Sequence, residues 1–228
     1  MTTSLSETAG AVLVRRRDAL ANRVALLDAG LAALTRDPDA SLESIAREAG
    51  LSRRTVYGHF SSRDELVVAI AVRAGDRLVA ALDAVDTSAD DPATALARFE
   101  LAVWRAAEPF RFLGALAARS EHRDRALERL APLRERRAGL VRAGQEDGVF
   151  RTDTEAEVLA RVAGGAVLAV FDELLAGTLA ADAAGRLVAT TALAVVGVAP
   201  AKAARCADAA ASAAPAASTS VDVRDGRA

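Results

Sequence analysis

The segment LSRRTVYGHF, residues 51–60, gathers hydrogen-bonding side chains of several kinds in one short stretch. Arg53 and Arg54 are adjacent, and Thr55, Tyr57 and His59 follow them. An arginine can donate two hydrogen bonds to O6 and N7 of guanine, and a threonine offers a methyl group to thymine or a hydroxyl group to phosphate. Tyrosine and histidine can hydrogen-bond to phosphate oxygens. This chemistry suits contact with a DNA duplex.

Further polar residues around this segment would add contacts to phosphate. Ser41, Ser52 and Arg63 stand at predicted helix starts, where unpaired backbone N–H groups and the positive dipole end favour anions. Arg16 and Arg17 belong to a basic cluster at the entry to the first predicted helix. The alternative is that these arginines form an ordinary solvated face of a helical bundle, with Tyr57 half-buried in packing.

Local sequence signals predict three helices that would hold these side chains in place. In SLESIAREAG, Ser41 is a good N-cap and Gly50 suits the left-handed position that closes a helix. Ser52 can cap a second helix that begins at Arg53, and the spacing of Ser62 and Glu65 predicts a capping box for a third helix that runs to about residue 85. Two short helices joined by a tight turn form a helix-turn-helix. Its expected inward-facing residues are Leu42, Ile45, Ala46, Ala49, Leu51, Val56 and Phe60.

A longer helix is predicted to precede this unit, from about Arg16 to Thr35. Its apolar residues recur at helical spacing, and they are Leu20, Val24, Leu27, Leu31 and Leu34. Residues 1–14 are small and polar and are expected to form a flexible arm. Residues 15–85 are therefore predicted to be a DNA-binding domain with a connecting helix.

Composition favours an all-α fold and excludes several function classes. The chain of 228 residues is 52% hydrophobic, 26% charged and carries a formal net charge of −2, so DNA binding must rest on a local patch. The single cysteine, Cys206, argues against an internal disulfide or a zinc site and fits a reducing cytoplasm. No phosphate-binding glycine loop or metal-spaced cluster appears, so we expect neither catalysis nor a cofactor. The longest uncharged run, Leu187–Ala201, is shorter than the roughly 20 residues that span a bilayer.

The breaker-rich stretch DTSADDPATA predicts a domain boundary, with Asp91 as N-cap and Pro92 as the first helical residue. Residues 92–199 are expected to form a second helical domain. Its predicted helices are 92–107, 108–119, 122–146, 154–178 and 182–198. Thr154 and Glu157 have the spacing of a capping box. Residues 200–228 carry little apolar bulk and are predicted to be a disordered tail.

The stretch IAREAGLSRRTVYGHFSSRDEL resembles the TetR-type bacterial transcriptional regulators, and the resemblance extends from about Arg16 to Ala74. It rests on an alanine-glycine turn, a serine, a T-x-Y-x-x-F core and a basic-acidic pair before leucine. The resemblance implies that Thr55, Tyr57 and His59 lie on a recognition helix and that Arg63 lies near the phosphates. Two departures stand out. Arg54 replaces a residue that is small in many members, and Gly58 lies inside the recognition helix at a cost of about 1 kcal/mol.

The layout of that family also implies roles for residues 92–199. They would receive a ligand, and their last two helices would pair with those of a second copy. The candidate ligand contacts are Trp104, Phe110, Arg119 and Phe171. The alternative is that most of the large aromatic residues only pack in the hydrophobic core.

The sequence thus predicts a cytoplasmic, homodimeric regulator, associated with the nucleoid when bound to its operator. It would bind a palindromic operator in double-stranded DNA and be released by a small-molecule inducer whose identity is open. We expect a repressor, with no membrane partner. The alternative is a helical protein-interaction module without sequence-specific DNA binding, and a further one is a regulator with an empty pocket.

Overall fold

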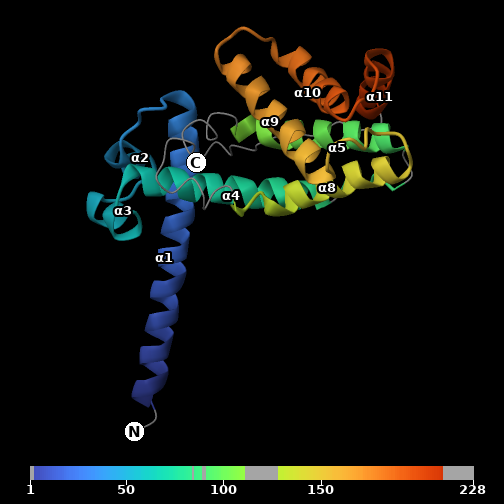
Figure 1. Cartoon of the computed structure of the whole chain (residues 1–228). Helices are drawn as coiled ribbons and strands as arrows, with labels where there is room; N and C mark the ends of the chain where they lie inside the picture. Colours follow the sequence, from blue (N-terminus) through green and yellow to red (C-terminus); the bar gives the residue numbers. More distant parts are fainter. Residues whose placement is uncertain (1–2, 84, 89–90, 111–127, 213–228) are drawn as a thin grey trace. The chain divides into compact units, whose positions relative to one another are not determined.

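The computed structural model describes residues 3–83, 85–88, 91–110 and 128–212, without the side chains of residues 3–15 and Pro109. This part of the chain contains helices and no strand, which confirms the predicted all-α class (Figure 1). It forms two compact units, one from Met1–Ala84 with Ala106–Leu133 and the other from Val85–Arg105 with Arg134–Ala228. Among the described helices, none is long and apolar enough to cross a membrane.

The first unit contains the predicted helix-turn-helix. Its helices are α1 (Thr3–Arg36), α2 (Leu42–Glu48), α3 (Arg53–His59) and α4 (Arg63–Asp83). Their shared core is closed to solvent, with exposures of 0–1% for Leu26, Leu34, Ile45, Ala46, Val56, Phe60, Leu66 and Ile70. The predicted inward set is confirmed, since its other members are buried or partly buried in the same core. Burial of this apolar surface fixes α3 against α1, α2 and α4.

The predicted caps set the bounds of α2 and α3. The Ser41 hydroxyl accepts a hydrogen bond of 3.1 Å from the Ser44 N–H, and the Ser52 hydroxyl accepts one of 3.1 Å from the Thr55 N–H. Gly50 has φ +68°, and the Leu51 N–H returns to the Ala46 carbonyl at 2.8 Å. A left-handed residue at this point reverses the chain between the two helices, as the sequence predicts.

The start of α4 departs from the predicted capping box by one residue. The Ser62 hydroxyl accepts a hydrogen bond of 3.1 Å from the Glu65 N–H, as expected. The Glu65 carboxylate, however, accepts from the backbone N–H and the hydroxyl of Ser61, at 2.7 and 2.8 Å. Ser61 and Ser62 therefore both form hydrogen bonds with Glu65, and these bonds stabilise the turn between α3 and α4.

One expectation about α1 is wrong. The helix begins at Thr3, so the stretch expected to be a flexible arm, residues 1–14, is helical from its third residue. Leu20 and Val24, which share the apolar stripe of this helix, are 65% and 50% exposed. Alanine, leucine and arginine favour helix without tertiary support. Among the residues of α1 whose side chains the structure describes, those in the buried core begin at Leu26.

The described part of Ala106–Leu133 belongs to the first unit. It includes η1 (Glu108–Phe110), whose Phe110 packs against the N-terminal core. A Cβ atom at Gly75 of α4 would lie 3.3 Å from the Arg129 side chain and 3.6 Å from Leu130, so this segment approaches α4 closely. The rest of predicted helix 108–119 and the start of 122–146 lie outside the described residues.

The second unit is built from α5 (Pro92–Ala107), α8 (Ala131–Glu146), α9 (Ala156–Leu175) and α10 (Ala181–Val195). Asp91 caps α5 as predicted, because its carboxylate accepts hydrogen bonds from the Ala93 N–H and the Thr94 hydroxyl. The capping box of Thr154 and Glu157 is wrong. The N-cap of α9 is Glu155, and Glu157 pairs with Arg142 of α8 instead.

The expected disordered tail is also wrong in its first part. Residues Pro200–Ser212 form α11, whose Ala203, Cys206, Ala207 and Ala210 are 1–7% exposed in the core of the second unit. Proline suits the first turn of a helix, and alanine has the strongest helix propensity. Small side chains also let α11 lie close to the other helices. The remaining residues of the predicted tail, 213–228, lie outside the residues that the structure describes.

Candidate nucleic-acid interface

Helix α3 is anchored on one side and open on the other. Val56 and Phe60 are fully buried, whereas Arg54, Tyr57 and Gly58 are exposed and the Arg53 side chain is 76% exposed. Thr55 and His59 are partly buried. The structure therefore brings the five candidate residues of α3 together and leaves both arginines accessible to a large partner.

Glu43 of α2 joins this surface, and sequence reasoning missed it. The Tyr57 hydroxyl donates a hydrogen bond of 2.7 Å to Oε1 of Glu43, and Nη2 of Arg53 lies 3.4 Å from the same oxygen. The Arg53 guanidinium also lies 5.5 Å from the centre of the Tyr57 ring. We call these three residues the Glu43 network. Glu43 lies on a different helix from Arg53 and Tyr57, so no helical spacing links it to them.

The Glu43 network shifts the titration of its members. The hydrogen bond from Tyr57 is the main cause that lowers the pKa of Glu43, and its own backbone and Arg53 act in the same direction. The same hydrogen bond raises the pKa of Tyr57, aided by burial and the Glu43 charge. At neutral pH, Glu43 is therefore an anion and Tyr57 keeps its proton.

The two candidate serines are engaged in local structure. The Ser41 and Ser52 hydroxyls accept the capping hydrogen bonds of α2 and α3, and Ser52 Oγ also lies 2.8 Å from Thr55 Oγ1. Their side chains remain at the exposed surface. Their first role in this structure is to begin the helices that carry the interface.

Arg63 and the α1 arginines belong to other helices than α3. Nε of Arg63 donates to the Ala40 carbonyl at 3.0 Å, and its Nη2 donates to the Pro38 carbonyl. This side chain therefore ties the first residue of α4 to the loop between α1 and α2. Arg16 and Arg17 are exposed on the part of α1 that precedes its buried residues, and Figure 1 shows α1 continuing well past α2 and α3.

Of the four candidate ligand contacts, the structure brings two together. Trp104 and Phe171 stack with ring centroids 4.4 Å apart, and they are 6% and 7% exposed. A Cβ atom at Gly185 of α10 would lie 3.0 Å from Trp104 Cδ1, so the stack is closely covered. Phe110 belongs to the other unit, and Arg119 lies outside the described residues.

The second unit also contains a buried ion pair that the sequence did not indicate. Nε of Arg137 donates to Oε1 of Glu100 at 2.5 Å, and its Nη2 donates to Oε2 at 3.0 Å. Glu100 is 0% and Arg137 is 4% exposed. Residues 37 apart in sequence, on α5 and α8, carry no local signal of such a contact.

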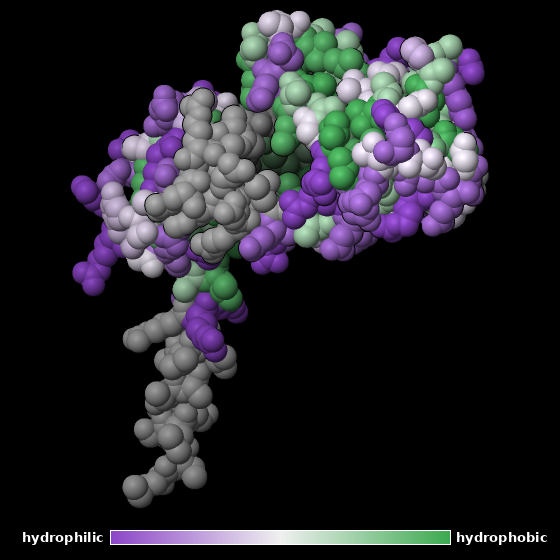
Figure 2. Space-filling model, viewed as in Figure 1, coloured by the Kyte–Doolittle hydropathy of each residue, from purple (hydrophilic) through white to green (hydrophobic). Residues whose placement is uncertain are grey.

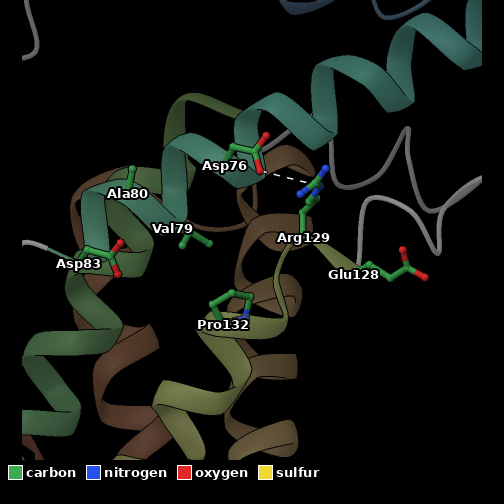
Figure 3. Close-up of a pocket in the computed structure, with 7 residues that line it drawn as sticks. All are labelled: Asp76, Val79, Ala80, Asp83, Glu128, Arg129 and Pro132. Carbon is green, nitrogen blue, oxygen red and sulfur yellow. Dashed lines mark ion pairs between the residues drawn. The ribbon is translucent and has the colours of Figure 1, made fainter.

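A hollow of about 270 Å³ lies on the first unit, between the C-terminal half of α4 and the segment that leads into α8 (Figure 3). Its charged lining comprises Asp76, Asp83, Glu128 and Arg129, and its apolar lining comprises Val79, Ala80 and Pro132. Arg129 Nε lies 3.9 Å from Asp76 Oδ1. None of the predicted ligand contacts is among these residues.

Comparison with known proteins shows that residues 26–70 match the bacterial regulatory proteins of the tetR family. The chain is 50% identical over 56 residues to the HTH-type transcriptional regulator AlkX of Mycobacterium tuberculosis (strain ATCC 25618 / H37Rv). That match covers 22% of this chain and 26% of AlkX, about a quarter of the relative's length. The family match contains the motif that carries the predicted resemblance, which is thereby confirmed.

Solved structures extend the likeness to the whole fold. RolR in complex with resorcinol is 24% identical and has a TM-score of 0.62, with coverage of 84% of this chain and 95% of RolR. The transcriptional regulator FadR of Bacillus subtilis, in complex with stearoyl-CoA, is 12% identical with a TM-score of 0.64, and the coverage is 76% and 97%. The chain shares the fold of these proteins in both its N-terminal and its C-terminal helices.

Proposed function

Because residues 26–70 form a TetR-type helix-turn-helix, we propose that this chain is a transcriptional repressor that binds DNA through α2 and α3. The observation that carries the proposal is that α3 is buried on one side and exposed on the other. Its apolar side is fixed by Val56 and Phe60, and its opposite side presents exposed Arg53, Arg54 and Tyr57. A rigid helix with exposed guanidinium groups fits the major groove of DNA.

The proposed division of labour separates base reading from positioning on the backbone. Arg53 and Arg54 contact base edges, and Thr55, Tyr57 and His59 contact phosphates or thymine methyl groups. Ser41, Ser52, Arg63, Arg16 and Arg17 add contacts to the backbone. Arg63 would make its contact while it remains bound to the α1–α2 loop or after it leaves that loop.

A homodimer is proposed because one helix of seven residues reads few base pairs. Support comes from α9 and α10, whose large apolar side chains Val162, Leu168, Leu175 and Leu187 are 41–57% exposed. Figure 2 shows hydrophobic surface over this part of the second unit. Burial of such a surface against a second copy would produce two-fold symmetry and hence a palindromic operator.

A small-molecule inducer is proposed by analogy with RolR and FadR, which hold resorcinol and stearoyl-CoA. The candidate contacts remain Trp104, Phe110, Arg119 and Phe171. Trp104 is the chain's only tryptophan and stacks on Phe171, so its fluorescence reports directly on this region. Titration of candidate compounds should change Trp104 emission and release bound DNA at the same concentrations. Release of DNA without a change in Trp104 emission would indicate that the inducer binds at a site away from Trp104.

DNA binding is tested by selection of bound duplexes from a random pool. The full chain is used, in a buffer that resembles the cytoplasm in which we propose it acts. A symmetric consensus is the expected result, since it requires both base reading and a dimer. Binding without any sequence preference would favour the alternative, a helical interaction module whose basic helix docks an acidic protein. Salt-dependent binding to duplexes distinguishes this module from a regulator.

A further inference from the structure

We propose that Glu43 is a specificity-determining residue that competes with DNA for two side chains, with phosphates for Tyr57 and with base edges for Arg53. In the unbound protein its carboxylate holds both side chains, and only a duplex that also satisfies the base-reading residues displaces it. The inference rests on the proposed DNA binding through α3. It adds a residue of α2 that suppresses binding to non-operator DNA.

The geometry puts one oxygen atom at the centre of the Glu43 network. Oε1 of Glu43 accepts the Tyr57 hydroxyl at 2.7 Å and lies 3.4 Å from Nη2 of Arg53. The guanidinium also lies over the tyrosine ring, 5.5 Å from its centre. Two of the side chains expected to meet DNA, Tyr57 and Arg53, therefore already interact with a negative charge of the same unit.

The competition at Tyr57 is strict because a phenol hydroxyl carries a single proton. When that proton is donated to Glu43, it is not available to a phosphate oxygen. Arg53 differs, since a guanidinium has five N–H donors and can keep one contact while it makes another. A phosphate contact of Tyr57 thus requires loss of its contact with Glu43.

The network is accessible and is not what holds α3 in place. Its side chains are 36% exposed for Glu43, 44% for the Tyr57 residue and 76% for Arg53. Val56 and Phe60, both 0% exposed, fasten the helix to the core. Substitution of Glu43 should therefore alter binding and leave the helix-turn-helix folded.

Charge distinguishes Arg53 from its neighbour. The Glu43 carboxylate offsets the charge of Arg53, whereas Arg54 has no ion-pair partner among the described residues. The hydrogen bond from Tyr57 lowers the pKa of Glu43, so the carboxylate is charged at neutral pH. Non-specific binding depends on phosphate neutralisation, so an anion at this point weakens it more than it weakens binding to an operator.

The experiment compares the full-length chain with Glu43→Gln on the selected operator and on a scrambled duplex, by fluorescence anisotropy across a potassium chloride series. Glutamine keeps an acceptor oxygen and removes the charge. We expect affinity for the scrambled duplex to rise by about threefold to tenfold and the ratio of operator to scrambled affinity to fall. The slope of log K against log salt should steepen by about 0.9 for each additional phosphate that the variant neutralises.

Glu48→Gln is the matched control, since Glu48 lies on the same helix and pairs with Arg36 at 2.6 Å. It removes the same charge and leaves the Glu43 network intact. An equal effect of the two variants would overturn the proposal, because general charge would then explain the result. Lower operator affinity of Glu43→Gln with unchanged scrambled binding would also overturn it, since Glu43 would then only orient Arg53 and Tyr57.

A double-mutant cycle with Tyr57→Phe tests the single-proton argument. Loss of the hydroxyl should weaken scrambled-duplex binding more in the Glu43→Ala background than in the parent, because only there is the hydroxyl released to phosphate. Equal effects in both backgrounds would contradict competition at Tyr57. A parent chain that does not prefer its selected operator would instead overturn the proposed function itself, and this inference with it.

Discussion

The Arg137 guanidinium binds the Glu100 carboxylate inside the second unit through two hydrogen bonds of 2.5 and 3.0 Å. A buried site of low polarity tolerates such a pair only when both partners are present. We predict that Glu100→Gln or Arg137→Met lowers the free energy of unfolding by about 3–5 kcal/mol, because each leaves one buried polar group without its partner. Urea denaturation measures the loss.

The double variant should recover part of that loss, since no unpaired charge remains. Arg186 and Asp208 offer a comparison, because they form an equally two-pronged pair in the same unit with side chains 55% and 63% exposed. Solvent screens that pair, so Asp208→Asn should change stability far less. Similar losses at both pairs would mean that burial does not govern the contribution of Arg137.

Gly144 of α8 leaves space for the buried Phe150 ring. A Cβ atom at Gly144 would overlap with Cδ2 of the Phe150 ring. Phe150 is 4% exposed and has little room to move. Gly144→Ala should therefore destabilise the chain by about 1–3 kcal/mol through overpacking, despite the better helix propensity of alanine.

Gly139→Ala is the control on the same helix. A Cβ atom there would meet nothing within 4 Å, so alanine should stabilise α8 by up to about 1 kcal/mol. Thermal unfolding of the two variants should shift in opposite directions. A shift of the same sign would show that helix propensity, and not the Phe150 contact, decides the outcome.

Arg54 and Arg53 differ in their surroundings, and we predict different effects on operator choice. Arg54→Ala should cost about 1–3 kcal/mol of discrimination between the operator and a single-base variant, as expected for loss of a two-pronged base contact. Arg53→Ala should cost less, because a contact of Arg53 with the operator must first replace its ion pair with Glu43. Competition binding with a panel of single-base operator variants provides the measurement. A larger loss for Arg53→Ala would reverse the proposed order.

Asp91 should make the second unit sensitive to acid. The Thr94 hydroxyl is the main cause that lowers the pKa of the Asp91 carboxyl below its ordinary value of 3.8, and the backbone N–H groups of Ala93 and Thr94 and the charge of Lys202 act in the same direction. A carboxyl whose pKa is lower in the folded chain stabilises the fold above pH 3.8. This contribution is lost as the pH falls through the folded-state pKa.

Asp91→Ala should lower stability by about 1 kcal/mol at neutral pH, since it removes the cap of α5. The difference from the parent chain should shrink as the pH falls below 3.8. Asp91→Asn keeps the cap without a titrating group, so its stability relative to Asp91→Ala should stay constant over that range. Urea denaturation at several pH values measures both differences, and a gap between parent and Asp91→Ala that widens in acid would contradict the assignment.

The parts of the fold that depend on near neighbours could be predicted from the sequence. The helix caps Ser41, Ser52 and Asp91 accept hydrogen bonds from residues two or three positions further along the chain. Gly50 reverses the chain through its own backbone conformation. The apolar residues of the helix-turn-helix follow helical spacing, so its core was also predictable. Local interactions of this kind leave a readable pattern.

Contacts between residues that are distant in sequence arise from the packing of the helices. Glu43 joins Tyr57 across 14 positions, Arg137 joins Glu100 across 37, and Arg63 binds carbonyls more than 20 residues away. The same holds for burial, because Leu20 and Val24 fit the helical stripe of the buried Leu34 and are yet 65% and 50% exposed, while the alanines of α11 are held by a core that other helices build. Contact and burial depend on how helices pack, and packing is a property of the folded chain that no single segment carries.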